Sequence, residues 1–103
     1  MEPEAVVEKI RDKLSQKIEV EKIYLYGSRA RGNHHRNSDF DIAVISEDFK
    51  DLNHQERYQS IIDPIREIIS DKPVDVNCYT PKEFQKGKKG FLPKIIEEEG
   101  ISA

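Results

Sequence analysis

The sequence predicts one α/β domain with a three-stranded core sheet. Its 103 residues suit a single compact domain and leave no room for a second one. Segments with the period of an amphipathic helix alternate along the chain with short runs rich in β-branched and aromatic residues. That alternation is typical of a sheet covered by helices.

Two longer segments, 3–17 and 53–70, have the apolar period of a helix. Their apolar side chains recur at three- and four-residue steps and form one stripe in each segment. Pro64 interrupts the second pattern, so we expect a kink there or a new helical start capped by Asp63. The stripe residues are Val6 or Val7, Ile10, Leu14 and Ile18, then Tyr58, Ile61, Ile62, Ile65, Ile68 and Ile69.

Three short runs, Ile23–Tyr26, Asp39–Ile45 and Val74–Tyr79, read as strands because they are rich in β-branched and aromatic residues. The stretch TPKE, from Thr80 to Glu83, predicts a capped helix start. A last helix is expected over 91–99, and Gly100 ends it. A fourth strand or a terminal tail fits at one edge of the sheet.

Composition narrows the class of protein. Charged residues make up 36% of the chain and the formal net charge is −3, which argues against direct nucleic-acid binding through a basic surface. Cys78 is the single cysteine, so no internal disulfide forms and a cytoplasmic location is expected. The acidic N-terminus lacks an apolar signal core, and no apolar run approaches the ~20 residues that span a bilayer.

Two aspartates open the second predicted strand. Asp39 and Asp41 alternate with Phe40, so both carboxylates project from one face about 7 Å apart. Phe40 and Ile42 then point to the opposite, core-facing side. Two ionised carboxylates this close repel each other unless a cation lies between them. A divalent cation such as Mg²⁺ prefers these oxygen ligands.

A third carboxylate, Asp75, has the same layout on the third predicted strand, where it alternates with Val74 and Val76. If the second and third strands are neighbours, Asp39, Asp41 and Asp75 converge. Three such carboxylates can hold two metal ions about 3.5–4 Å apart, the arrangement used for in-line phosphoryl displacement.

A Gly-Ser turn follows the first predicted strand. Gly27 permits a close backbone approach to a ligand or a positive φ, and Ser28 offers a hydroxyl at the start of a short helical segment. Backbone N–H groups at such a start attract phosphate. Arg29 and Arg31 add positive charge, one for phosphate and the other for a carboxylate. Ser38 is placed to bond a phosphate or orient Asp39.

Each of these signals has an ordinary structural explanation when it stands alone. Gly-Ser is a common turn, Asp-x-Asp often caps a strand, and a lone strand aspartate is usually an ion-pair partner. His34 and His35 could bind zinc adventitiously, although adjacent histidines make a poor designed site. The lysine loop, Lys86–Lys89, is either a solvated loop or a contact for acceptor or phosphate. The combination of turn, spacing and third aspartate is far more specific.

The combination resembles the minimal nucleotidyltransferase domain of the DNA polymerase β superfamily. That family's signature, Gly-Ser followed by ten residues and Asp-x-Asp, is filled by Gly27, Ser28, Asp39 and Asp41, and its third carboxylate maps onto Asp75. The resemblance spans 1–103 and implies a polymerase β-like fold, a small mixed sheet with helices packed on one face. It implies two Mg²⁺ ions on the three aspartates, which are the catalytic residues, and nucleotide contacts from Gly27, Ser28, Arg29 and Ser38.

Members of this size resemble the antitoxin of HEPN/minimal nucleotidyltransferase toxin–antitoxin pairs. The resemblance implies transfer of AMP from ATP to a tyrosine of a HEPN-type helical toxin. The partner would contact the loop 33–37, the lysine loop, and the helix face around Phe91 and Leu92. Three alternatives stay open: a non-catalytic module that masks the toxin, a transferase acting on a small molecule or an RNA end, and a metal-dependent nuclease.

Overall fold

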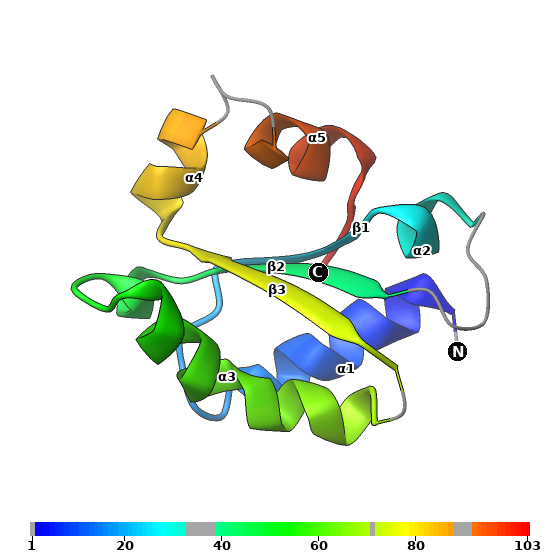
Figure 1. Ribbon diagram of the computed structural model, residues 1–103, viewed down its shortest axis with the longest axis horizontal. Helices are drawn as coiled ribbons and strands as arrows, with labels where there is room; N and C mark the ends of the chain where they lie inside the picture. The colour runs from blue at the N-terminus through cyan, green and yellow to red at the C-terminus, as the bar shows by residue number, and fades with distance from the viewer. Residues whose placement is uncertain (1, 33–38, 71, 88–91) are drawn as a thin grey trace.

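The computed structural model describes residues 2–32, 39–70, 72–87 and 92–103 and has helices on both sides of one sheet (Figure 1). No helix in those ranges is long and apolar enough to cross a membrane. The elements in chain order are α1 (Pro3–Leu14), β1 (Lys22–Tyr26), α2 (Ser28–Arg31), β2 (Phe40–Ile45), the 3-10 turn η1 (Glu47–Phe49), α3 (His54–Ile68), β3 (Val74–Tyr79), α4 (Pro81–Gly87), α5 (Leu92–Glu99) and β4 (Ile101–Ser102).

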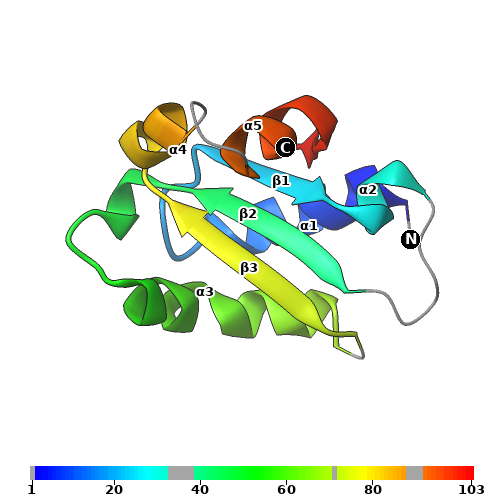
Figure 2. The same cartoon turned by 45° about the horizontal axis from the view of Figure 1, so that its top comes forward.

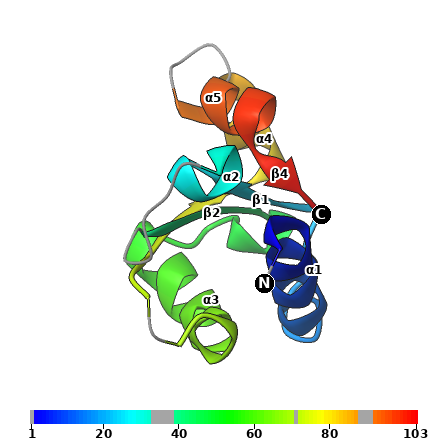
Figure 3. The same cartoon turned by 90° about the vertical axis from the view of Figure 1, so that its right-hand side faces the viewer.

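The sheet is mixed and has the strand order β3-β2-β1-β4, of which Figure 2 shows the first three strands side by side and Figure 3 shows β4. β2 runs antiparallel to β1 and parallel to β3, and the parallel connection passes through α3. β4 is the expected fourth strand, paired antiparallel with β1. Backbone hydrogen bonds of 3.0 Å in each direction join Ile23 and Ala103, and the Arg11 side chain donates to the Ala103 carbonyl at 2.8 Å. The predicted fold class is confirmed.

One face of the sheet packs on α1 and α3, which lie side by side beneath it (Figure 3). The strands contribute the residues that point away from the aspartates, and the two helices contribute their predicted apolar stripes. This is the main hydrophobic core, and its burial is the chief driving force for folding. The fully buried members include Ile10, Leu14, Ile23, Ile42, Val44, Phe49, Ile61 and Ile65.

The opposite face is also partly covered, by α4 and α5. Phe84 of α4 and Ile96 of α5 are buried against Tyr24, Ala43 and Ile45, and the rings of Tyr24 and Phe84 stack with centroids 5.6 Å apart. Helices therefore cover both faces of the sheet. The expectation that all helices pack on one face was wrong for α4 and α5. The physical reason is that this face of β1 and β2 is itself apolar and requires a cover.

Helix α3 begins and continues as a single element. Asn53 caps it in a capping box with Glu56, with both hydrogen bonds at 2.9 Å. The helix runs without interruption through Pro64, so the new start expected at Asp63 is absent. Proline removes only one helical N–H, and the buried Ile61 and Ile65 hold the helix to the core on both sides of it.

The predicted capping box at Thr80 is confirmed and belongs to a larger network. Thr80 and Glu83 exchange backbone-to-side-chain hydrogen bonds of 2.9 and 3.2 Å. The Arg57 guanidinium donates twice to Glu83, at 2.6 and 3.0 Å, and once to the Cys78 carbonyl at 3.2 Å. Arg57 is only 5% exposed, so this network ties α3 to β3 and α4.

Glu83 should make the stability of the protein fall in acid. Its hydrogen bond from Arg57 lowers the pKa of Glu83 from 4.5 to about 2, so the stabilisation is present above about pH 4.5 and is lost as the pH falls toward 2. Because Glu83 is half exposed, we expect Glu83→Gln to cost only about 1 kcal/mol at pH 7. Thermal melts should show this deficit shrinking between pH 5 and pH 2, and a constant deficit would contradict the pKa shift.

Candidate functional site

Asp41 and Asp75 lie side by side on neighbouring strands, in a row that Tyr26 of β1 completes. In the parallel pairing of β2 with β3, Asp41 is opposite Asp75, and in the antiparallel pairing of β1 with β2, Tyr26 is opposite Asp41. Opposite residues share a face of the sheet. Phe40 and Val76 belong with the main core on the other face. The predicted alternation is therefore confirmed, and β2 and β3 are neighbours, as the convergence of the carboxylates requires.

The three carboxylates interact electrostatically. Burial, the charge of Asp75 and the charge of Asp39 together raise the pKa of Asp41, and the nearby Arg31 guanidinium opposes the shift. Asp39 and Asp75 are exposed, and Asp41 is half-buried. The site is thus an acidic patch that α4 and α5 leave open, at the end of the sheet where β2 and β3 begin.

This donor set fits a divalent cation by its chemistry. Three carboxylates on one face, with Asp41 destabilised by its like-charged neighbours, are oxygen ligands of the kind that Mg²⁺ prefers. In this conformation no group of three or more acidic, histidine or cysteine side chains within the described ranges is close enough to hold an ion. The side chains of Asp39, Asp41 and Asp75 would have to turn toward a bound ion.

Gly27 brings the turn into contact with Asp41. Its φ of 73° and ψ of −155° lie in a region almost restricted to glycine. A Cβ atom built on Gly27 would stand 2.3 Å from Asp41 Oδ2, far inside van der Waals contact. The Gly27 carbonyl accepts hydrogen bonds from Ala30 and Arg31 at 3.2 and 3.1 Å, which begin α2. The half-buried Ser28 therefore starts a helical turn directly beside the aspartate row.

The two arginines of α2 differ in their surroundings. Arg31 lies near enough to Asp41 for its positive charge to oppose the rise in the pKa of that carboxylate. Arg29 stacks its guanidinium 4.2 Å from the centroid of the Phe40 ring, on a residue that points away from Asp41. Nothing in this placement tests the predicted contact of Arg29 with phosphate.

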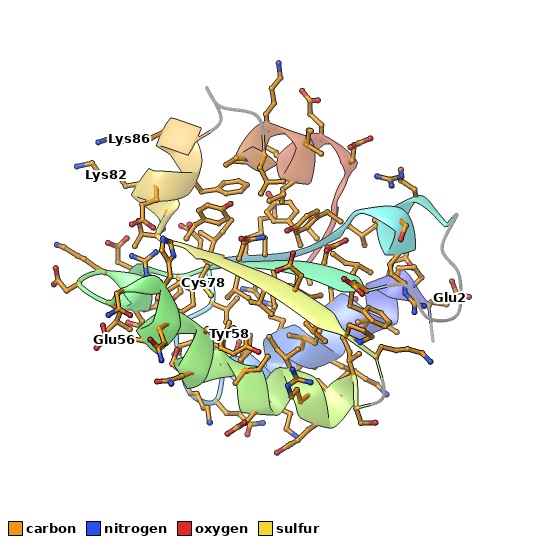
Figure 4. The ribbon with its side chains drawn as sticks, in the orientation of Figure 1. Glu2, Glu56, Tyr58, Cys78, Lys82 and Lys86 are labelled. Carbon is orange, nitrogen blue, oxygen red and sulfur yellow. The ribbon has the colours of Figure 1, made fainter. Side chains whose placement is uncertain are left out.

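Several predicted residues fall outside the described ranges. These are Ser38, the loop 33–37 with His34 and His35, and Lys88, Lys89 and Phe91. Lys82 and Lys86 extend from α4 away from the sheet (Figure 4). Leu92 is exposed at the start of α5.

A polar contact that the sequence did not predict lies beside the aspartates. Asn77 Nδ2 donates to the Tyr26 hydroxyl at 2.6 Å. Asn77 follows Asp75 by two positions and so shares its face, a signal that the alternation within VDVN already contained.

Cys78 is a structural residue. It is a buried residue of β3 that lines the same cavity as Tyr58 of α3 (Figure 4). Burial raises the pKa of its thiol to about 12, so the nucleophilic thiolate is absent at neutral pH. A cavity of about 300 Å³ beside it is lined by neither Asp41 nor Asp75, and it is separate from the aspartate row.

A small mixed sheet with an acidic row beside a glycine turn is the arrangement expected of a nucleotide-binding protein with divalent-metal chemistry. A family model described as "Nucleotidyltransferase domain" matches residues 7–103. The chain therefore belongs to the nucleotidyltransferase domain family.

Solved structures support the same fold. A candidate nucleotidyltransferase from Sulfolobus solfataricus is 22% identical, with a TM-score of 0.65, over 97% of this chain and 78% of that one. A toxin–antitoxin structure with AMP-PNP is 27% identical, with a TM-score of 0.67, over 92% and 69%. A mutant of the toxin–antitoxin MntA-HpeT is 21% identical, with a TM-score of 0.57, over 99% and 72%. A search of curated proteins finds no match.

Proposed function

We propose that this protein is a Mg²⁺-dependent nucleotidyltransferase that transfers AMP from ATP to a tyrosine hydroxyl of a HEPN-type toxin, and that it works in the cytoplasm. The observation that carries the proposal is the register of β2 and β3. It places Asp41 opposite Asp75, next to the Gly27 turn. A purely structural role would not require two carboxylates to face each other at a cost in repulsion.

Each part of the site has a role in this reaction. Asp39, Asp41 and Asp75 would hold two Mg²⁺ ions. Gly27 and Ser28 would hold the outer phosphates, with Ser38 beside them. Bound Mg²⁺ supplies neutralisation of the charge that develops on the phosphates. Arg29 would contact the nucleotide after leaving the Phe40 ring, while the charge of Arg31 acts on Asp41.

The proposed chemistry is an in-line displacement. The acceptor oxygen forms a bond to the α-phosphorus of ATP, and the bond from that phosphorus to the bridging oxygen breaks, so that pyrophosphate leaves. The acceptor proton passes to Asp75, an exposed carboxylate at the open end of the row. The product is an AMP phosphodiester on the acceptor. Positioning of the reactants and electrostatic stabilisation of the developing charge together supply most of the rate in such reactions.

The partner is inferred from two observations. The described helices α1, α3, α4 and α5 all pack on the sheet, so none of them is free to form a separate acceptor-binding unit. Two similar structures are toxin–antitoxin assemblies, one of them with AMP-PNP. The first observation favours an acceptor presented by another chain, and the second favours ATP as the donor and a toxin as that acceptor.

Co-expression with a candidate HEPN partner tests the proposal. After incubation with ATP and Mg²⁺, intact mass spectrometry should show AMP-sized increments on the partner. Asp39→Ala should abolish these increments, whereas Asp12→Ala, at an exposed position on α1, should not. An unmodified partner alongside an adenylylated small molecule or RNA end would overturn the protein acceptor. A toxin that is inhibited without any change in mass would instead support a non-catalytic masking module.

A further inference from the structure

A hydrogen bond between Tyr26 and Asn77 bridges the sheet beside the aspartates. Tyr26 ends β1 and Asn77 lies on β3, with β2 between them. Adjacent strands are about 4.8 Å apart, so the two side chains must lean toward each other across β2 to meet at 2.6 Å. The bridge therefore crosses the strand that carries Asp41.

A small residue beneath the bridge makes this crossing feasible. Ala43 of β2 is opposite Asn77 on one side and opposite Tyr24 on the other, and it is fully buried. Its methyl group leaves space above β2 that a larger side chain would fill. The next residue of β2 on this face toward the open end is Asp41. The bridge thus lies immediately behind the acidic row.

The Tyr26 hydroxyl can donate a hydrogen bond in addition to the one that it accepts. Its oxygen accepts from the Asn77 amide, which leaves the O–H proton available to another acceptor. Burial raises the pKa of Tyr26 to about 12, the Asn77 hydrogen bond opposes that shift, and the charges of Asp41 and Asp75 add to it. The hydroxyl consequently remains protonated at neutral pH and lies within the field of both carboxylates.

We propose that Tyr26, held in place by Asn77, is a positioning residue that directs its hydroxyl at the Asp41–Asp75 pair and sets their orientation for a divalent cation. The inference rests on the proposed function, because it concerns the same carboxylates. Groups that hydrogen-bond to metal ligands orient those ligands, and their loss typically weakens metal binding by about 10–100-fold.

Tyr26→Phe tests the role, because it removes the hydroxyl and keeps the ring. In Mn²⁺ titrations of the intact protein with AMP-PNP, followed by electron paramagnetic resonance, we expect the apparent Kd for Mn²⁺ to rise about 10-fold. Tyr79→Phe is the matched control. Tyr79 of β3 packs edge-on to Phe84 on the same face of the sheet as Tyr26, and its pKa is raised by burial and by Cys78 but not by the aspartates. Loss of the Tyr79 hydroxyl should change the apparent Kd for Mn²⁺ by less than about 2-fold.

The coupling between the two residues gives a second readout. Asn77→Ala should weaken Mn²⁺ binding as well, and the double variant Tyr26→Phe with Asn77→Ala should be no weaker than Tyr26→Phe alone, because both act through one hydroxyl. If the two substitutions weaken Mn²⁺ binding additively, the hydrogen bond between Tyr26 and Asn77 is not the cause of the weaker binding. Thermal melts of each variant show whether weaker Mn²⁺ binding merely reflects a less stable fold. A general loss of stability would weaken Mn²⁺ binding in Tyr26→Phe and Tyr79→Phe alike.

The outcomes distinguish this proposal from the proposed function. An unchanged Mn²⁺ Kd for Tyr26→Phe, in a wild-type protein that transfers AMP, overturns the positioning role alone. A 10-fold weaker Kd in a protein whose wild type transfers no nucleotide supports the positioning role and removes the proposed function. A wild-type protein that binds no Mn²⁺ at all overturns the positioning role.

Discussion

Asp41→Asn is expected to abolish nucleotide transfer and to leave the fold as stable as the wild type or more so. Asp41 is central in the acidic row, between Tyr26 and Asp75, so its loss removes a ligand from the proposed cation site. A loss of at least about 10³-fold, or about 4 kcal/mol of transition-state stabilisation, is the scale for charge neutralisation of this kind.

The stability half of this prediction follows from the pKa of Asp41. Burial and the charges of Asp75 and Asp39 raise that pKa, so the native chain holds the proton more tightly than the unfolded chain. The ionisation of Asp41 therefore lowers the stability of the fold as the pH rises above the pKa that Asp41 has in the unfolded chain. Asparagine removes that cost while keeping the shape of the side chain.

Melting curves at pH 7 without divalent cations, paired with the transfer assay, check both halves. Asp12→Asn on the surface of α1 is the control and should change neither quantity. A variant at position 41 that transfers at the wild-type rate would remove Asp41 from the mechanism. A marked drop in its melting temperature would instead show that Asp41 is a structural residue.

Gly27→Ala is expected to lower stability and to disrupt the site together. The backbone at Gly27, with a φ of 73° and a ψ of −155°, costs a residue with a Cβ about 1–3 kcal/mol. The added methyl would also meet Asp41 Oδ2 at 2.3 Å, so either the turn or the carboxylate must move. A fall of several degrees in the melting temperature and loss of AMP-PNP binding should follow.

Gly32→Ala separates backbone strain from the contact with Asp41. Gly32 also has a positive φ, of 78°, but a Cβ atom there meets nothing within 4 Å. We expect a cost of about 1–2 kcal/mol from the left-handed backbone alone, with binding of AMP-PNP retained. If both variants bind the nucleotide equally well, the close approach of Gly27 to Asp41 is irrelevant to binding.

Strong local signals made much of the fold predictable. Strand β3 has the predicted bounds, and the capping box of Thr80 and Glu83 forms as TPKE indicated. These signals depend on neighbours in sequence, where spacing alone fixes the geometry. The same logic placed Asp39 and Asp41 on one face, and the register of β2 with β3 brought Asp75 opposite Asp41.

The cover on the second face was missed, although the sequence contained a sign of it. Ile23 to Tyr26 and Ile42 to Ile45 are runs with no polar alternation, and every residue in them is buried. Strands buried on both faces show such continuous apolar runs. The contacts of Phe84 and Ile96 are long-range, so the short helices α4 and α5 could be predicted as helices but not assigned to a face.

Side-chain contacts that depend on how distant elements pack together could not be predicted. Tyr26 and Asn77 meet only because β1, β2 and β3 lie in that order. The stacking of Arg29 on Phe40 and the action of Arg31 on Asp41 depend on how α2 is set against the start of β2. The sequence alone does not show which arginine lies near Asp41 and which stacks on Phe40, because both belong to the same short helix.

The parallel crossover between β2 and β3 has a kinetic consequence. β1 and β2 can pair as neighbours in the chain, which brings Tyr26 beside Asp41, but Asp75 arrives only after α3 has closed the connection. Non-local pairings of this kind form late because loop closure must come first. A cation that needs both carboxylates would then bind only the completed fold. We therefore expect Mg²⁺ to slow unfolding and to leave the folding rate almost unchanged.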